Sequence, residues 1–270
     1  MSSRVVVLGG CGAWPEAGRA CSGFLVEHDE FRVVLDLGYG TLPPLLALLG
    51  SSTAIGLDAV VVTHDHPDHV VDLHGLFRAR SYAASQEARI PLYAPAAVLD
   101  RIAGLEDSDR TAVGRVFDWS PLPGAASRVG PFVMESWTLP HYVLNVGVRL
   151  STPEFVLAYT GDTGPDAALV DLGHNADLYI VDSTDRHQRT GHAPSADVEP
   201  AMNLTARQAG EIARAAGARR LMLTHFWPDN DRERSRQAAA EAFAGEVLLA
   251  DEGTEVPLQG PTRPTSPSRA

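Results

Sequence analysis

Lysine is missing from this chain: all 22 basic residues are arginine, against 34 acidic residues. Chemistry that needs a lysine amine, such as Schiff-base catalysis or a phosphate-binding P-loop, is therefore excluded. Cysteine is also scarce, because Cys11 and Cys21 are too few for a disulfide scaffold. The formal net charge of −12 repels polyanions at long range and argues against a general nucleic-acid binder.

Long apolar runs are absent as well. No uncharged apolar stretch approaches the roughly 18–20 residues needed to cross a bilayer. The N-terminus enters the apolar run 5–8 directly, without the longer apolar stretch and the small-residue cleavage site of a signal peptide. We therefore expect a cytoplasmic protein with no membrane partner. Its 270 residues are enough to bury a sizeable core.

Histidine and aspartate, in contrast, are concentrated in one short segment. Residues 63–69 read Thr-His-Asp-His-Pro-Asp-His and follow the apolar run 59–62. The segment supplies four side chains that can bind metal: His64, His66, Asp68 and His69. Neutral imidazoles suit zinc, iron or nickel, and carboxylates neutralise the charge of the ion. The spacing allows two metals, with the first two ligands on one and the last two on the other; the alternative is a polar turn with chance histidines.

Three more candidate ligands follow apolar runs elsewhere in the chain: His141, Asp162 and His225. Taken singly, a histidine after a strand is more often a packed or surface residue. Taken together, the strand-end positions favour one set of five histidines and two aspartates. Asp162 could bridge two metals about 3.5–4 Å apart, which would flank a phosphoryl or carbonyl group.

The order of expected elements is strand-rich, helical, strand-rich and helical, with one ligand set in each half. This order predicts an α/β protein with two mixed sheets flanked by helices, a four-layer αββα sandwich. No linker divides the chain, so we expect one domain over residues 1–259. Residues 260–270 are rich in Pro, Ser, Thr and Arg, and we expect a disordered tail there. Helices are expected at 42–49, 70–84, 96–105 and 232–243, among others.

The ligand pattern resembles the metallo-β-lactamase fold superfamily, and the resemblance runs from Val5 to about Val256. Within it, Gly161-Asp162-Thr163 and Leu223-Thr224-His225 look like the branch that contains RNase Z and small bacterial cyclic-nucleotide phosphodiesterases. The resemblance implies two divalent metal ions, with zinc first and manganese or iron as alternatives. It also implies that Asp162 is the single bridging carboxylate and that Asp36, in Asp-x-Gly-x-Gly, buttresses the metal loop.

The chain also departs from that branch. Asn203 stands where relatives have a histidine, and an amide cannot deliver a proton near neutral pH. No Gly/Lys-rich insertion resembles the tRNA-gripping arm of RNase Z. Asp182 ends an expected strand, where it could orient a metal-bound histidine or cap a turn.

Two loops and two of the remaining histidines can be interpreted in more than one way. The Gly-rich loop 9–18 is interpreted as a flexible wall of the active site rather than a phosphate cradle. The polar loop 184–200 could close over substrate, or it could be a disordered insertion. Of the histidines outside the set, we expect His28 to be solvated in a turn and His74 to lie on a helix surface or behind the ligands.

The sequence thus predicts a metal-dependent hydrolase, with Asp68 and Asp162 as candidate catalytic residues and Asp36, Asp182 and Asn203 as candidate supporting or substrate-contacting residues. The leading hypothesis is a phosphodiesterase that acts on a small phosphodiester, such as a cyclic nucleotide (cAMP), through a metal-bound hydroxide. The alternatives are a thioester or lactone hydrolase, an RNA-processing nuclease, or a metal-loaded binding module without activity. Nucleic acid is an unlikely partner on this reading, and a homodimer is possible.

Overall fold

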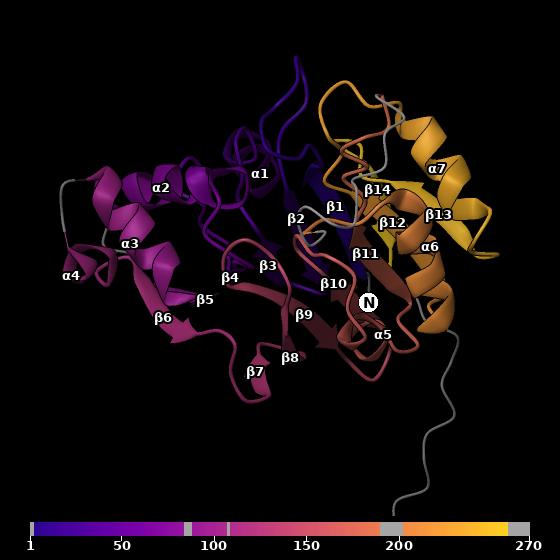
Figure 1. Cartoon of the computed structure of the whole chain (residues 1–270). Coiled ribbons are helices and arrows are strands. Elements are labelled where there is room, and N and C mark those ends of the chain that lie inside the picture. Colours follow the sequence, from indigo (N-terminus) through magenta and orange to yellow (C-terminus); the bar gives the residue numbers. More distant parts are fainter. Residues whose placement is uncertain (1–2, 84–87, 107–108, 190–201, 259–270) are drawn as a thin grey trace, which may run out of the picture.

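A computed structural model describes residues 3–83, 88–106, 109–189 and 202–258. The expected tail at 260–270 and most of the expected loop at 184–200 lie outside these ranges. Figure 1 shows α1, α2 and α3 grouped on one side of the molecule and α6 and α7 on the opposite side, with the strands between them. This arrangement is the predicted pair of sheets flanked by helices.

Each sheet has seven strands, and both are mixed. The first sheet has the order β14 (Glu255–Pro257), β1 (Ser3–Gly9), β2 (Gly23–His28), β3 (Phe31–Leu35), β4 (Ala59–Val61), β5 (Ile90–Ala94) and β6 (Phe117–Pro121). The second has the order β13 (Glu246–Leu249), β12 (Arg220–Thr224), β11 (Leu178–Asp182), β10 (Val156–Tyr159), β9 (Asn145–Ser151), β8 (Phe132–Leu139) and β7 (Ser127–Val129).

The two sheets repeat one pairing scheme. In the first, β14, β1, β2 and β3 pair antiparallel, and β3 to β6 pair parallel. In the second, β7 to β10 pair antiparallel, and β10 to β13 pair parallel. The helices are α1 (Leu42–Leu49), α2 (Pro67–Ser81), α3 (Ala96–Leu105), α4 (Arg110–Val113), α5 (Ala168–Leu172), α6 (Ala206–Ala215) and α7 (Arg232–Ala240). The four-layer α/β class is confirmed.

Two apolar cores hold these layers together, and β1 contributes to both. Val5 and Val7 belong to the core between the sheets, whereas Val6 and Leu8 belong to a second core that also includes side chains of α1, α2 and α3. This division follows from the alternation of side chains along a strand. Because both faces of the strand are covered, β1 is apolar at every one of these positions rather than at every second one.

Two helices have boundaries that differ from expectation: α2 at both ends, since it stops at Ser81 rather than 84, and α7 at its end. Helix α2 begins at Pro67, three residues before the expected start, because proline is preorganised for the first helical turn. Asp68 and His69 are therefore helical residues, whereas the expected helix started directly after them. Helix α7 ends at Ala240 rather than at 243, since the chain must turn at Gly245 to enter β13. Helices α1 and α3 have the expected bounds.

The expectation that His28 is solvated is wrong. His28 is the last residue of β2 and is 8 % exposed. Its ring lies 5.4 Å from that of Phe155 and 5.8 Å from that of Phe132, and its Nδ1 shares a 2.6 Å hydrogen bond with Ser3 Oγ. Within the described ranges, no helix is long and apolar enough to cross a membrane.

Candidate metal centre

All seven predicted ligands meet where strands of both sheets end. Those from the first sheet follow β4 and open α2: His64, His66, Asp68 and His69. Those from the second sheet follow β8, β10 and β12: His141, Asp162 and His225. They form two groups, in each of which the candidate ligand atoms lie within 4.8 Å of one another.

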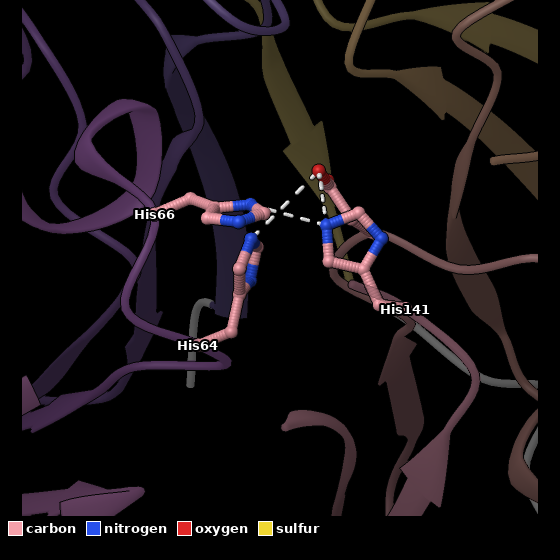
Figure 2. A group of neighbouring side chains, drawn as sticks. His64, His66 and His141 are labelled. Atoms are coloured by element: carbon pink, nitrogen blue, oxygen red, sulfur yellow. Dashed lines mark hydrogen bonds and ion pairs between the residues drawn. The ribbon is translucent and has the colours of Figure 1, made fainter. Parts of the chain in front are cut away.

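The first group consists of His64, His66, His141 and Asp162. Figure 2 shows the three imidazoles converging from two separate parts of the chain. His141 Nε2 lies 3.1 Å from His66 Nδ1 and 3.5 Å from Asp162 Oδ2. His64 Nε2 lies 3.8 Å from the same carboxylate oxygen.

The second group consists of Asp68, His69, Asp162 and His225. His69 Nε2 lies 3.1 Å from Asp162 Oδ1, and His225 Nε2 lies 3.1 Å from Asp162 Oδ2 and from Asp68 Oδ2. Asp162 belongs to both groups and is the candidate ligand that they share.

Several of these polar atoms are buried without a hydrogen bond, among them His64 Nε2, His69 Nε2 and Asp162 Oδ1. A buried polar atom without a partner costs free energy, so such atoms are rare in folded proteins. Asp36 accepts a hydrogen bond from His69 Nδ1, so that in the neutral imidazole Nε2 would present a lone pair to the Asp162 carboxylate. A cation between them removes this repulsion, and the nitrogen and oxygen donors therefore fit a divalent metal.

The electrostatics of these side chains agree with this fit. Burial opposes the charged form of His69, but the carboxylates of Asp162, Asp68 and Asp36 outweigh it and raise its pKa well above the ordinary value. In the same way, the carboxylates outweigh burial at His225 and raise its pKa to about 9. Protons on these two imidazoles balance the negative charge of the carboxylates, as bound metal ions would.

Asp36 forms hydrogen bonds that orient the candidate ligands of the first sheet. It is fully buried at the end of β3 and has a φ of 56°, which is uncommon for a residue with a side chain. Its carboxylate accepts hydrogen bonds from Thr63 N, Thr63 Oγ1, His69 Nδ1 and Tyr159 OH at 2.8–2.9 Å. Asp36 thus fixes the orientation of one candidate ligand and the start of the loop that carries the others.

Asp182 contacts the candidate ligand His225 through the hydroxyl of Thr184, a residue that the sequence analysis did not identify. Thr184 Oγ1 donates to Asp182 Oδ1 and lies 2.8 Å from His225 Nδ1, whereas Asp182 Oδ1 itself is 3.7 Å from that nitrogen. Burial raises the pKa of Asp182 to about 6. A threonine two residues after a strand-end aspartate is the only sequence signal, and it is too common to single out Thr184.

Asn203 lies beside this aspartate. Its Nδ2 donates to Asp182 Oδ2 at 3.0 Å, and Thr163 N donates to the same oxygen at 3.1 Å. A neighbouring backbone contact was also missed: His141 Nδ1 lies 2.9 Å from the carbonyl oxygen of Met202. That contact fixes the tautomer of His141, so that Nε2 is left for the first group.

The Gly-rich loop 9–18 passes along the second group. Ala13 N donates to Asp68 Oδ2 at 2.6 Å. A Cβ atom added to Gly12 would lie 2.7 Å from the His225 ring, so glycine is required for this close approach. The loop therefore has the position of the predicted wall. His74, in contrast, contacts Glu106 at 2.5 Å and takes no part in either group.

A salt bridge anchors the loop between His64 and His66. Arg101, in α3, places Nη2 at 2.7 Å from Asp65 Oδ2 and donates from Nε to the Asp65 carbonyl oxygen at 3.2 Å. Sequence reasoning did not pair these residues, because they are 36 positions apart and each reads as an ordinary surface charge.

Comparisons with known proteins agree with this geometry. Residues 32–226 match the Beta-lactamase superfamily domain. The chain is 28 % identical over 253 residues to Probable metallo-hydrolase YhfI of Bacillus subtilis (strain 168), covering 93 % of this chain and 98 % of that protein. It is 30 % identical over 321 aligned positions to Ribonuclease Z of Halorubrum lacusprofundi, covering 96 % and 98 %.

Solved structures give the same result. The crystal structure of YhfI, a metallo-beta-lactamase fold protein, superposes with a TM-score of 0.79 at 26 % identity, covering 95 % of this chain and 100 % of that one. A diphosphatase from the PhnP family shares the fold, with a TM-score of 0.70 at 19 % identity over 94 % and 97 % of the two chains. The chain therefore belongs to the beta-lactamase superfamily and is a metal-dependent hydrolase.

Proposed function

We propose that the two ligand groups hold two divalent metal ions and that the protein hydrolyses a small phosphodiester, with a cyclic nucleotide as the first choice. The observation that carries the proposal is the place of Asp162, whose oxygens lie 3.1–3.8 Å from candidate ligands of both groups. A single carboxylate between two clusters of buried imidazoles fits a two-metal centre better than any structural role.

The ligands divide between the two ions as the groups do. One metal would take His64, His66, His141 and Asp162, and the other would take Asp68, His69, Asp162 and His225. Zinc suits this donor set best, and manganese or iron could occupy the same ligands. When bound, such a pair activates water as a nucleophile and neutralises charge that develops on the oxygens of the substrate.

The residues of the chain itself have three tasks in this proposal. Asp68 and Asp162 supply the negative charge that holds the ions. Asp36 and Thr184 hold His69 and His225 in the orientation that presents Nε2 to the metal. Asn203 offers an amide donor beside the centre but cannot give up a proton near neutral pH. Protonation of a leaving group then requires another acid.

A small phosphodiester is preferred to RNA because of charge. The chain carries a formal net charge of −12, which repels a polyanion, whereas one phosphate can be neutralised by two local divalent ions. The similarity to Ribonuclease Z supports chemistry at a phosphodiester, and it keeps RNA as the competing substrate. Thioester or lactone hydrolysis would use the same centre on a carbonyl carbon.

A substrate panel tests the proposal. Protein loaded with zinc or manganese is assayed on cyclic AMP, bis(4-nitrophenyl) phosphate, an acyl thioester, a lactone and a precursor tRNA, with metal content measured on the same samples. We expect cyclic AMP and the nitrophenyl diester to be hydrolysed fastest, and His66→Ala to remove this activity while His74→Ala keeps it. Dominant thioesterase activity, efficient tRNA cleavage at physiological salt, or no turnover by fully loaded protein would each refute it.

A further inference from the structure

Two tryptophans, Trp14 and Trp227, lie on chain segments whose neighbouring residues belong to or contact the second ligand group. Trp14 and Trp227 pack edge to face, with ring centroids 5.1 Å apart and an interplanar angle of 76°. Trp14 is 49 % exposed, although large aromatic side chains are usually covered in a folded protein. The guanidinium carbon of Arg186 lies 5.0 Å from the centroid of Trp227. The packing of the core does not account for the exposed Trp14 ring beside a half-buried Trp227 that has a cation over its face.

The backbone next to Trp14 contacts the candidate metal centre. Its neighbour Ala13 donates a hydrogen bond to Asp68 Oδ2, and Trp14 N donates to Gly12 O at 2.7 Å. Gly12 in turn lies against the imidazole of His225. The exposed indole is therefore attached to a loop that contacts two candidate ligands.

Trp227 and Arg186 are attached to the same ligand group. Trp227 follows His225 by two residues, and its backbone N donates to Thr184 O at 3.3 Å. Arg186 follows Thr184 by two residues, and the Thr184 hydroxyl contacts His225 Nδ1. Two residues of extended chain span about 7 Å, so both side chains begin within that distance of residues that hold the centre.

We propose that Trp14, Trp227 and Arg186 form a subsite that stacks the aromatic base of a nucleotide while its phosphate lies at the metals. The inference rests on the proposed function and names the part of the substrate, other than phosphate, that the protein recognises. Flat bases stack on exposed indoles and on guanidinium planes, largely without regard to base identity. An acyl chain would instead need an enclosed apolar pocket.

Binding of two ligands that differ by the base alone tests the subsite. AMP and ribose 5-phosphate carry the same phosphate and sugar, and isothermal titration of zinc-loaded protein gives both affinities. We expect AMP to bind about 5- to 100-fold more tightly, as base–aromatic stacking predicts. Trp14→Ala should bring the two affinities together by weakening AMP alone, whereas Trp14→Phe should keep most of the preference.

Matched controls separate recognition from structure. Trp119 is 36 % exposed on β6, so Trp119→Phe should change neither affinity. Metal content and melting temperature are measured for each variant, because Trp14→Ala could act by loosening the loop at Asp68. Equal binding of AMP and ribose 5-phosphate by the wild-type protein, or a parallel loss of both in Trp14→Ala and Trp14→Phe, would overturn the subsite.

Hydrolysis distinguishes failure of the subsite from failure of the proposed function. If cyclic AMP and ribose 3′,5′-cyclic phosphate are cleaved with equal kcat/KM, the phosphodiesterase proposal stands and the subsite is wrong. If no cyclic phosphate is cleaved but Trp14→Ala still abolishes the preference for AMP, the subsite stands and the phosphodiesterase proposal is wrong. A higher KM for cyclic AMP alone in Trp14→Ala, with kcat unchanged, is the outcome that both proposals expect.

Discussion

Asp36 and His69 are joined by a 2.8 Å hydrogen bond between two side chains that are fully buried and 33 residues apart. The same carboxylate accepts hydrogen bonds from Thr63 and Tyr159, so it connects the end of β3 with the segment 63–69 and with β10. The orientation of His69 therefore depends on a buried residue that belongs to neither ligand group.

Asp36→Ala should weaken both folding and metal binding. Loss of the carboxylate leaves buried donors without acceptors, and breaking such a network costs about 3–5 kcal/mol. Loss of the contact that orients a metal ligand lowers affinity about 10–100-fold. Urea unfolding of metal-free protein and competitive zinc titration measure the two effects. Tyr159→Phe removes one donor and should cost about 1 kcal/mol with little change in zinc affinity; unchanged affinity in Asp36→Ala would contradict the role of Asp36.

Thr184→Val should weaken metal binding without a large loss of stability. Valine keeps the shape of threonine but removes the hydroxyl between Asp182 and His225. Zinc affinity of the second group should fall about 10-fold or more, as for other contacts behind metal ligands. Thr184→Ser, which keeps the hydroxyl, is the matched control. Equal affinities for the valine and serine variants would show that the hydroxyl does not orient His225.

Variants of single ligands should change the number of bound metals in different ways. His66 belongs to one group and Asp162 to both. His66→Ala should therefore reduce the metal content toward one ion per chain, whereas Asp162→Ala should reduce it toward zero. Elemental analysis after equilibrium dialysis gives the counts, with His74→Ala as control. Two ions bound by Asp162→Ala would refute the assignment of the shared carboxylate.

Metal binding should release protons. The pKa of His225 is about 9 in the metal-free site and that of His69 is also raised, so both carry protons at pH 7. A metal binds the neutral imidazole, and zinc affinity should therefore fall as the pH drops below about 9. For the same reason the metal-free protein should lose stability as the pH rises from about 6.5 to about 9. Calorimetry in buffers of different ionisation enthalpy counts the protons, and a count of zero at pH 7 would contradict this prediction.

Asn203→His should speed hydrolysis of an alkyl phosphodiester more than that of a nitrophenyl diester. The new imidazole would stand beside Asp182, which now accepts from the Asn203 amide, and could protonate a poor leaving group. General acid catalysis is worth about 10²–10⁴-fold, and a nitrophenolate leaving group needs no proton. The ratio of kcat/KM values for the two substrates measures the effect, with Asn203→Ala as control. Equal changes on both substrates would show that position 203 is not an acid site.

The sequence was sufficient to predict the layer order and the proximity of the seven candidate ligands, because most of them follow apolar runs and strand ends meet at sheet edges. The sequence could not predict the hydrogen bonds that orient these candidate ligands. Thr184 and the carbonyl of Met202 form hydrogen bonds with His225 and His141, and no sequence motif marks these contacts. The same limit applies to Arg101 and Asp65, whose pairing depends on how α3 packs beside the metal loop.

His28 was misplaced for a related reason. Its neighbours Asp29 and Glu30 are typical of a turn, and the turn does begin directly after it. The strand nevertheless extends to His28, where aromatic side chains of the second sheet cover the ring. Burial of that kind is set by tertiary packing, which local sequence does not report.

The division of the candidate ligands between the two sheets has a mechanical consequence. Four of the candidate ligands belong to the first sheet and three to the second, so the ions would fasten one sheet to the other at a shared edge. Pulling the sheets apart would then require breaking coordination bonds, and every increment of binding free energy would also resist that separation. The metal centre would thus hold the two sheets together in addition to supporting the reaction. Removal of the metals by a chelator should therefore loosen the interface between the sheets first.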